Sequence, residues 1–484
     1  MNLKPYPAMK DSGVPWLGEV PEHWEVLPSR AFFTEVKERD RPEEQMLSVT
    51  ITKGVIRQQA LLADSSKKDS SNQDKSAYKL VQPGDIAYNK MRAWQGAVGV
   101  SQYRGIVSPA YVVQRPREGA DSRYLHYLLR TPAFAKEAER WSYGITSDMW
   151  SLRPEHFKMI YGCLPPLAEQ TAIVRLLDHA GRLIQRYIRA KQKLIKLLEE
   201  QKQAIIHRAV TRGLRAEAAA KAGLDPNVRL QPSGVEWLGE VPEHWEVTRL
   251  KFIATRIVDC LHATPAYSEA GEHPAIRTAD VQPGRLLLES ARRVDDEHYL
   301  QWTARMTPAE GDILYTREGE RFGIAALVPA GVRLCISQRM MAFRIHPAHN
   351  SAYVMWQINC RHVYAQAAAD LVGAAAPHVN VERIKNLWLT LPPRPEQDEI
   401  VAAIESEHTG PNAAIARAQN EISLFREYRT RLIADVVTGK LDVRAAAASL
   451  PDEPEEPEMV DDTGALDEKN EVEETDIDTG AVEP

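Results

Sequence analysis

The sequence predicts an α+β fold with two homologous globular domains separated by two long helices, which pair as an antiparallel coiled coil with pseudo-two-fold symmetry. Two observations predict this plan. The string SGVPWLGEVPEHWEV at Ser12 is repeated at Ser233 with fourteen of fifteen positions identical. Each half also ends in a long stretch whose apolar residues lie three, four or seven positions apart, which is typical of a coiled-coil seam.

The duplication extends along most of the chain. PGDIAYNK at 83–90 matches EGDILYTR at 310–317, and LPPLAEQTAIV at 164–174 matches LPPRPEQDEIV at 391–401, both at an offset of 227. A period this long indicates tandem domains rather than a solenoid. A chain of 484 residues is long enough for two to four domains. Short β-type runs with Gly and Pro turns precede each long helix, so each module is expected to mix strands and helices.

A Leu-Pro-Pro string opens each long helix, because proline is tolerated in the first helical turn. Glu169 and Glu396 follow it and place negative charge at the positive end of the helix dipole. The Gly410-Pro411 pair predicts that the second helix is interrupted there, either by a kink or by a division into two helices. Since one exposed apolar stripe is unfavourable, we expect the helices to pair into a rod with a module at each end. The alternative is that each helix packs on its own module.

The predicted boundaries follow from these blocks. They are a first module at 1–163, a first spacer helix at 164–213, a linker at 214–231, a second module at 232–390, a second spacer helix at 391–440, and an acidic, disordered tail at 441–484. The tail prediction depends on charge, because residues 451–484 hold fifteen Asp/Glu and one Lys, a net of 1 − 15 = −14. The whole chain carries −7, so residues 1–450 carry −7 + 14 = +7. A basic body behind an acidic tail is compatible with nucleic-acid binding.

The signatures of several enzyme classes are absent from the sequence. There is no GxxxxGK[ST] phosphate loop, no GxSxG elbow, no HExxH and no Asp/Asn-Pro-Pro-aromatic string of the adenine-methylase kind. The four cysteines lie far apart, which predicts buried thiols in a reducing cytoplasm and neither a disulfide framework nor a zinc site. The apolar runs are too short to span a bilayer, and the N-terminus lacks a signal-peptide core.

Two histidines, His23 and His244, lie in the repeated PEHW string and invite a metal-binding or catalytic interpretation. A structural interpretation is favoured, in which the string forms a turn whose Trp24 and Trp245 pack on the module.

In combination these blocks resemble the DNA-specificity subunits of type I restriction–modification systems. The strings that carry the resemblance are WLGEVPEHWEV twice, LPPLAEQ and LPPRPEQ, NKMRAWQGAVGVSQYRGIVSPAY at 89–111, and YRTRLIADVVTGKLDVR at 428–444. The resemblance covers residues 12 to about 444. It implies that each module is a target-recognition domain that reads one half of a bipartite, asymmetric site in double-stranded DNA. It also implies that the helices set the spacer between the half-sites.

Partners are implied by the same resemblance. Two adenine methyltransferase subunits are expected to dock on the conserved helix region, and an ATP-dependent restriction subunit can join them. S-adenosylmethionine, ATP and magnesium would then belong to those partners, whereas this chain would be non-catalytic, cytoplasmic and without a cofactor or metal. The alternative function is a coiled-coil interaction or anti-restriction protein that has no sequence-specific DNA reading of its own.

Candidate DNA-contacting residues come from polar loops of the two modules. Arg and Lys recognise guanine edges and phosphates, and Asn and Gln recognise adenine. The candidates in the first module are Lys67, Lys68, Asn72, Lys75, Lys90, Arg92, Gln95, Tyr103, Arg104 and Tyr143. Those in the second module are Arg317, which matches Lys90, and Arg321, Arg339, His378 and Asn380. The alternatives are a solvated loop at 67–75 and ordinary core packing for Trp94. The basic residues of the helices are interpreted as a solvated face.

Overall fold

The computed structural model describes residues 3–63, 74–146, 149–236, 238–319, 321–369 and 379–451. The chain forms two compact units. Unit 1 takes its described residues from 1–191 and 420–451, and unit 2 takes them from 192–419. Each unit therefore combines one module with part of both long helices, rather than following the linear order of modules and helices.

Unit 1 is built around an antiparallel sheet of four strands in the order β4-β11-β8-β9. Val113 at the middle of β11 lies opposite Val36 on β4 and Ala87 on β8, and it is fully buried. The strands are β1 (Met9–Asp11), β2 (Glu19–Pro21), β3 (Glu25–Pro28), β4 (Phe33–Val36), β5 (Leu47–Thr50), β6 (Gly54–Arg57), β7 (Lys79–Val81), β8 (Ile86–Asn89), β9 (Val98–Val100), β10 (Gly105–Val107), β11 (Tyr111–Pro116) and β12 (Tyr161–Leu164). The short helices are α1 (Ser29–Phe32), α2 (Gln58–Ala63), η1 (Ala93–Gln95), α3 (Ser122–Leu129), α4 (Pro132–Arg140) and α5 (Pro154–Phe157).

Unit 2 repeats this sheet as β16-β24-β21-β22, with Phe343 of β24 opposite Ile257 and Ile313. The strands are β13 (Leu230–Pro232), β14 (Glu240–Pro242), β15 (Glu246–Arg249), β16 (Ala254–Asp259), β17 (His273–Ile276), β18 (Val281–Gln282), β19 (Arg285–Leu286), β20 (Arg293–Val294), β21 (Ile313–Thr316), β22 (Ala325–Leu327), β23 (Cys335–Ile336), β24 (Met340–Ile345) and β25 (Trp388–Leu391). The short helices are α7 (Ala216–Lys221), α8 (Leu250–Ile253), η3 (Thr278–Asp280), α9 (Asp296–Thr303), α10 (Ser351–Ile358), α11 (Arg361–Ala368) and α12 (Val381–Lys385). The sheets match, whereas the segments between their strands differ.

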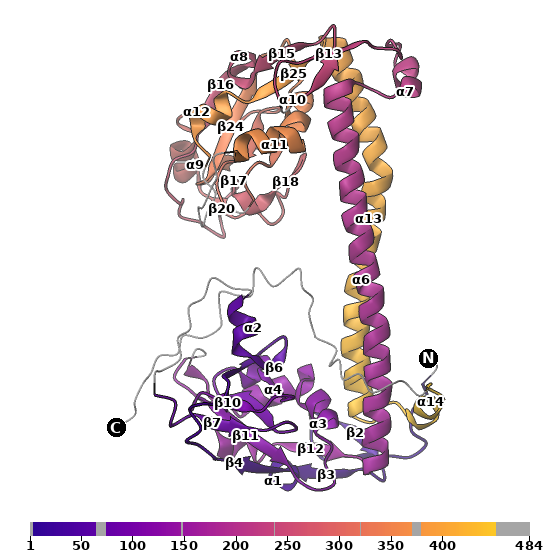
Figure 1. Cartoon of the computed structure of the whole chain (residues 1–484). Helices are drawn as coiled ribbons and strands as arrows, with labels where there is room; N and C mark the ends of the chain where they lie inside the picture. The colour runs from indigo at the N-terminus through magenta and orange to yellow at the C-terminus, as the bar shows by residue number, and fades with distance from the viewer. Residues whose placement is uncertain are drawn as a thin grey trace. The chain divides into compact units, whose positions relative to one another are not determined.

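The two long helices are α6 (Leu167–Arg212) and α13 (Arg394–Val437), and they lie side by side in Figure 1. In unit 1, α13 ends where α6 begins, because the Val437 carbonyl accepts hydrogen bonds from Tyr124 and Cys163. In unit 2, α6 ends where α13 begins, because the Val210 carbonyl accepts one from Thr390. The segments of α6 and α13 therefore run antiparallel within each unit. Each module contacts the start of its own helix and the end of the other.

The prediction that the helix divides in two at Gly410-Pro411 is wrong, because α13 continues through this pair with Pro411 inside the helix. A proline there removes one backbone donor and costs about 3 kcal/mol. Packing offsets this cost, since Ile404, His408 and Ile415 on both sides of the proline are buried. Gly410 also has no Cβ for the proline ring to strike.

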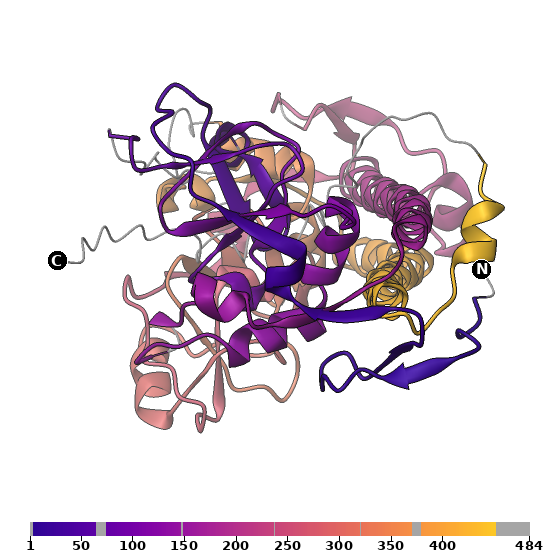
Figure 2. The ribbon, with the colours of Figure 1, turned by 90° about the horizontal axis from the view of Figure 1, so that it is seen from below.

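The predicted start of the disordered tail at 441 is also wrong. Residues 441–451 fold onto unit 1, where Lys4 pairs with Asp442, and α14 (Arg444–Ala448) follows. Figure 2 shows this yellow helix beside the indigo start of the chain. Val443 and Ala447 are buried in the core of unit 1, and this apolar burial keeps the segment in place. Residues 452–484 lie outside the described residues.

Candidate nucleic-acid interface

A buried glutamate attaches each module to the start of its long helix. In unit 1 the Glu169 carboxylate accepts a hydrogen bond from Trp24 Nε1 at 2.7 Å and contacts His23 Nε2 at 2.8 Å. In unit 2 Glu396 makes the same contacts with Trp245 at 3.0 Å and His244 at 2.8 Å. Both tryptophans are buried, so the structural interpretation of the PEHW string is confirmed.

The glutamine that follows each glutamate fixes one helix of the module, α3 in unit 1 and α10 in unit 2. Gln170 accepts from the backbone N–H of Asp121 at 2.7 Å and donates to the Pro165 carbonyl, and Asp121 caps α3. Gln397 accepts from Asn350 N–H at 2.8 Å, and Asn350 caps α10. The Glu-Gln pair in each LPPxxEQ string therefore ties the module to the helix by two separate sets of bonds. It gives both modules the same orientation on their helix.

A second repeated device positions the strand that leads to the candidate residues. Asp85 pairs with Arg115 at 2.8 Å in unit 1, and Asp312 pairs with Arg344 at 2.7 Å in unit 2. Each aspartate comes from a GDI string and also accepts a backbone N–H of the turn before its strand. These buried carboxylates hold β8 and β21 against their neighbouring strands. The segments just beyond β8 and β21 are thus held alike in the two units.

The predicted match between Lys90 and Arg317 agrees with their backbone bonds. The Lys90 N–H donates to Ala110, and its carbonyl accepts from Leu152 at 2.9 Å. The Arg317 N–H donates to Arg339 at 2.9 Å, and its carbonyl accepts from Val379 at 3.4 Å. The backbone of Lys90 therefore joins the loop before β11 to the loop before α5. The backbone of Arg317 joins the loop before β24 to the loop before α12 in the same way.

In unit 1 the segments that carry Lys90, Arg92, Gln95 and Tyr143 contact one another, and these four residues are here called the Lys90 face. Arg92 donates to Gln95 at 3.0 Å within η1, and Trp94 packs against Trp150 with ring centroids 5.5 Å apart. Tyr143 pairs with Ser151 and is 58% exposed. Trp94 and Trp150 thereby join η1 to the YGITSDMW loop, whose residues Ser147 and Asp148 lie outside the described residues.

Other first-module candidates lie on different loops. The Tyr103 ring stacks under the Arg57 guanidinium at 4.7 Å, and the exposed Arg104 pairs with Glu44 at 2.7 Å. Lys75 is partly exposed, and its carbonyl accepts from Tyr78 before β7. Lys67, Lys68 and Asn72 lie outside the described residues.

A buried lysine near the Lys90 face was missed by sequence reasoning. Lys79 donates to the Tyr111 carbonyl at 2.6 Å. Burial, followed by the positive charges of Lys90 and Arg39, lowers the pKa of Lys79 to about 8. Like charges close enough to lower a pKa indicate a positive potential, which suits a polyanion. Its position within the buried strand KLV gave no sign of this role.

In unit 2 the candidates divide into buried and exposed residues. Arg317 is only 3% exposed and pairs with Asp259 and Glu318, so in this conformation it orients its neighbours instead of presenting a free cation. Arg321 and Arg339 are exposed. Arg321 donates to the Val281 carbonyl at 2.8 Å, and Arg339 has a φ of 68°, which is uncommon for a residue with a side chain.

Asn380 is exposed and caps α12 by accepting from Glu382 N–H at 2.9 Å. His378, the remaining candidate of the second module, lies outside the described residues.

Comparison with known proteins identifies the relatives of this chain. No protein-family model matches it. The type I restriction enzyme EcoKI specificity subunit of Escherichia coli strain K12 is 21% identical over 452 residues, which is 88% of this chain and 90% of the relative. The EcoBI specificity subunit of Escherichia coli is 24% identical over 57% of this chain and 58% of the relative. This chain is thus similar to type I restriction enzyme specificity subunits, in one case over most of its length.

A solved structure agrees with this relationship at the level of the fold. It was described as "Structural basis underlying complex assembly and conformational transition of the type I R-M system". It matches 87% of this chain and 99% of its own with a TM-score of 0.58 and 16% identity. The fold of this chain is thus similar to that of the solved chain over most of its length. Among the helices that the structure describes, none has an apolar stretch of the length and hydropathy that a membrane span requires.

Proposed function

We propose that this chain is the DNA-recognition and scaffold subunit of a type I restriction–modification complex. The observation that carries the proposal is the homology to specificity subunits along 88% of the chain. The chain itself would perform no chemistry. S-adenosylmethionine, ATP and magnesium would act in partner subunits, in the cytoplasm, where the DNA is.

Each module would read one half of a bipartite, asymmetric site. The attachment to the helix and the central sheet are the same in both units, so the loops beyond β8 and β21 are held alike. Those loops carry different donors and acceptors, namely Lys90, Arg92 and Gln95 in unit 1 and Arg321 in unit 2. Unit 2 adds Arg339 from the loop before β24 and Asn380 from the loop before α12. Different donor and acceptor sets select different base pairs in the major groove. The uncommon backbone of Arg339 supports this role, since strained residues gather at functional sites.

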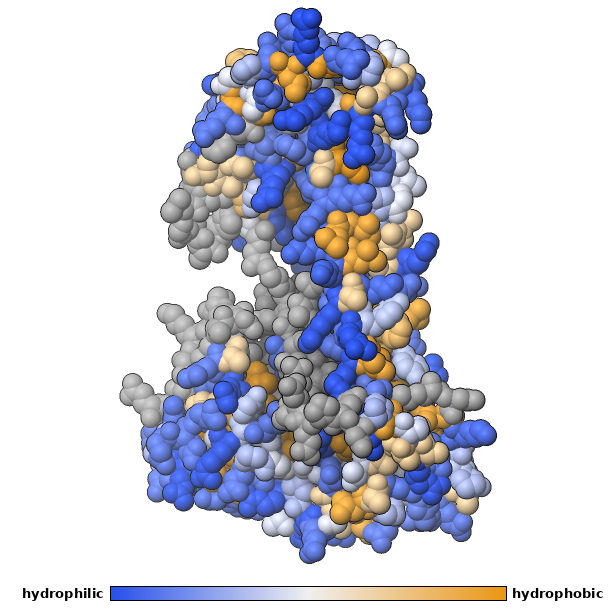
Figure 3. Space-filling model, turned by 45° about the vertical axis from the view of Figure 1, so that its right-hand side comes forward, coloured by the Kyte–Doolittle hydropathy of each residue, from blue (hydrophilic) through white to orange (hydrophobic). Residues whose placement is uncertain are grey.

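The long helices would pair along their whole length as a coiled coil that sets the spacer. With 46 residues, α6 is ~69 Å long at 1.5 Å per residue. Four leucines are exposed on these helices, namely Leu183, Leu194 and Leu197 on α6 and Leu424 on α13. The space-filling view in Figure 3 shows orange patches among blue ones on the surface. Exposed apolar side chains of this kind mark protein interfaces, here for two adenine methyltransferase subunits, with a restriction subunit as a further partner.

The test is to map methylated motifs in the host genome by long-read sequencing, with and without this gene. We expect one split motif to disappear on deletion and to return on complementation. Arg92→Ala should relax one position in one half of the motif, and Arg321→Ala one position in the other half. Each should cost about 1–3 kcal/mol of discrimination, because a bidentate arginine–guanine contact is worth that much. Arg30→Ala, which removes a charge from α1 instead, is the matched control and should leave the motif unchanged.

An unchanged set of methylated motifs after deletion, in cells that express the partner subunits, would contradict the proposal. An interaction or anti-restriction protein would instead give a complex that binds random DNA as tightly as the motif at physiological salt.

A further inference from the structure

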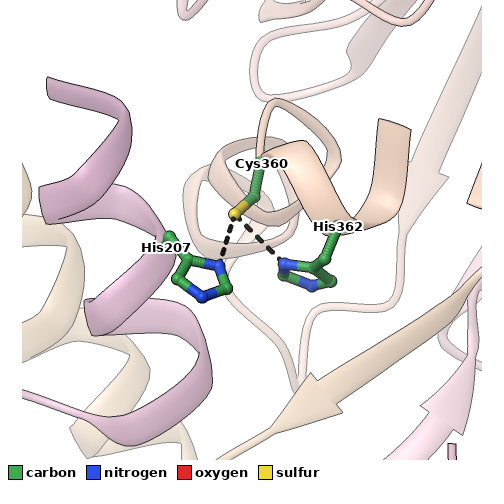
Figure 4. Close-up of side chains that lie close together, drawn as sticks. All are labelled: His207, Cys360 and His362. Atoms are coloured by element: carbon green, nitrogen blue, oxygen red, sulfur yellow. Dashed lines mark hydrogen bonds between the residues drawn. The ribbon is translucent and has the colours of Figure 1, made fainter. Parts of the chain in front are cut away.

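Three metal-ligating side chains meet inside unit 2, away from the candidate DNA-contacting loops. His207 comes from α6, Cys360 precedes α11, and His362 lies in its first turn. The Cys360 Sγ atom lies 3.5 Å from His207 Nδ1 and 3.1 Å from His362 Nδ1, as Figure 4 shows. The three ligand atoms all lie within 4.8 Å of one another.

The cluster is buried on one side and open on the other. Cys360 is fully buried and His362 is 7% exposed, whereas His207 is exposed. Within the part of the chain that the structure describes, His362 Nε2 is buried and has no hydrogen-bond partner.

The first repeat shows that the fold does not need these three residues. The caps of the matching helices α4 and α11 are Thr131 and Cys360, at an offset of 360 − 131 = 229. That offset matches His362 with Ala133 (362 − 229), and the offset of 227 along the long helices matches His207 with Ala434 (207 + 227). Thr131 caps α4 by accepting from Phe134 N–H, whereas Cys360 makes no such bond. The second repeat therefore carries all three ligands where the first carries a capping threonine and two alanines.

We propose that Cys360, His207 and His362 bind one divalent transition-metal ion of the zinc class, with water completing a tetrahedron on the open side of His207. Bond lengths of ~2.3 Å to sulfur and ~2.1 Å to nitrogen place sulfur and nitrogen ~3.5 Å apart in a tetrahedral site. The separation from Cys360 to His207 is 3.5 Å, at that value, whereas the separation to His362 is 3.1 Å, so the His362 ring would move outward by about 0.4 Å on binding. On binding, the thiol loses its proton to solvent as the sulfur–metal bond forms.

The bound ion would tie the end of α6 to α11 of the second module. The thiolate supplies one negative charge, which partly offsets the positive charge of the bound ion. Arg212 adds a further positive charge near His207. The role is structural, and it would hold the second module to a long helix in a way that the first module lacks. It revises the expectation that these separated cysteines form no metal site.

The test is titration of the purified full-length chain with Co²⁺ and Zn²⁺ after chelation and dialysis. We expect one equivalent of Co²⁺ to bind, with a thiolate-to-cobalt charge-transfer band and the intense visible bands of tetrahedral coordination, and Zn²⁺ to displace it. Cys360→Thr and His362→Ala should abolish the charge-transfer band and weaken binding by at least about 100-fold, since a lost ligand costs more than a lost supporting contact. Chelation should also increase amide exchange in α11 of the unmodified chain only.

Two controls separate ligand loss from misfolding. Cys360→Thr installs the residue that already caps the matching helix of unit 1, so circular dichroism should show a folded chain. Cys260→Ser, which changes a buried thiol elsewhere in unit 2, should bind Co²⁺ like the unmodified chain. Binding of less than a tenth of an equivalent by the unmodified chain, or equal binding by Cys360→Thr, would overturn the proposal.

Discussion

Unit 1 and unit 2 use the same glutamate to attach a module to its helix, but they surround it differently. Glu169 lies 3.4 Å from both the Tyr6 hydroxyl and an Arg444 guanidinium nitrogen, in addition to its histidine and tryptophan. Counterparts in unit 2 are Asn227 at the offset of 221 (6 + 221) and Glu217 at the offset of 227 (444 − 227). Neither of these two residues can replace the hydroxyl of Tyr6 or the guanidinium of Arg444 as a partner of Glu396.

This difference shows which segments of the chain complete the attachment in each unit. Arg444 belongs to the segment 441–451 that folds back onto unit 1, and its guanidinium lies 5.1 Å from the centre of the Tyr6 ring. Tyr6, from the start of unit 1, and Arg444, from the segment 441–451, thus complete the attachment in unit 1. In unit 2 the corresponding places are filled by the connection between the repeats, which contains α7.

The largest contrast is expected from removing each glutamate. Glu169→Ala should destabilise unit 1 by about 3–5 kcal/mol, because a buried indole N–H and a buried tyrosine hydroxyl lose their acceptor and Arg444 loses a partner. Glu396→Ala should destabilise unit 2 by about 2–3 kcal/mol, since fewer donors are left without a partner. Hydrogen exchange followed by mass spectrometry during urea denaturation would report the two units separately.

Glu169→Gln is the control that keeps an acceptor oxygen for Trp24 while removing the charge, and it should recover part of the loss. Equal destabilisation by the two alanine variants would show that Tyr6 and Arg444 add nothing to the attachment.

Much of the repeated framework can be predicted from sequence, because it consists of long or repeated signals. The LPPxxEQ strings mark the helix starts correctly, and dipole reasoning places a carboxylate there. It does not reveal that Trp24, 145 residues earlier, donates to that carboxylate. The likeness of Lys90 and Arg317 is also visible at a fixed offset. The sequence does not reveal that the buried Arg317 pairs with Asp259, because only the fold brings these two residues together.

The failures have physical causes in local rules that tertiary packing overrides. Gly410-Pro411 breaks an isolated helix, but buried neighbours on both sides keep α13 continuous. The segment 441–450 contains several apolar residues, but it is short, and the partners that bury Val443 and Ala447 come from distant parts of the sequence. His207 and Cys360 are separated by 153 residues, so spacing alone could not bring them together.

The long helices provide a second contrast, since Pro411 of α13 matches Ile184 of α6 (411 − 227). Ile184 is buried within an unbroken hydrogen-bond ladder, whereas Pro411 lacks the backbone donor. Pro411→Ala should therefore stabilise unit 2 by up to about 3 kcal/mol. The reciprocal change, Ile184→Pro, should destabilise unit 1 by at least that amount because it also removes a buried side chain.

Urea denaturation of both variants, with amide exchange at residues 404–415 as the local measurement, checks this pair. Faster exchange in Pro411→Ala than in the unmodified chain would mean that the proline is needed for the path of the helix.

The smallest contrast concerns acid. His126 of α3 accepts a hydrogen bond from Val100 N–H at 3.1 Å, and the matching residue of α10 is Met355 (126 + 229). Burial, followed by nearby arginines, lowers the pKa of His126 to about 3, well below the value of ~6.5 for an unfolded chain. The unfolded state therefore takes up a proton that the folded state refuses, so this stability is complete above pH 6.5 and is lost as the pH falls toward 3.

Lowering the pH from 7 to 5 should thus reduce the free energy of unfolding of unit 1 by roughly 1–2 kcal/mol through His126. Solvent screening of the partly exposed ring keeps this effect small. His126→Gln keeps an acceptor for Val100 but cannot be protonated, so it should flatten the pH dependence of unit 1 over that range. Unit 2 should keep its own acid sensitivity in this variant, because His362 also has a lowered pKa. Amide hydrogen exchange at β9 and α3 reports on unit 1, and exchange at α11 reports on unit 2. Measuring both at pH 7 and pH 5 separates the acid sensitivity of the two units. If the stability of unit 1 depends on pH as strongly in His126→Gln as in the unmodified chain, a titratable group other than His126 causes that dependence.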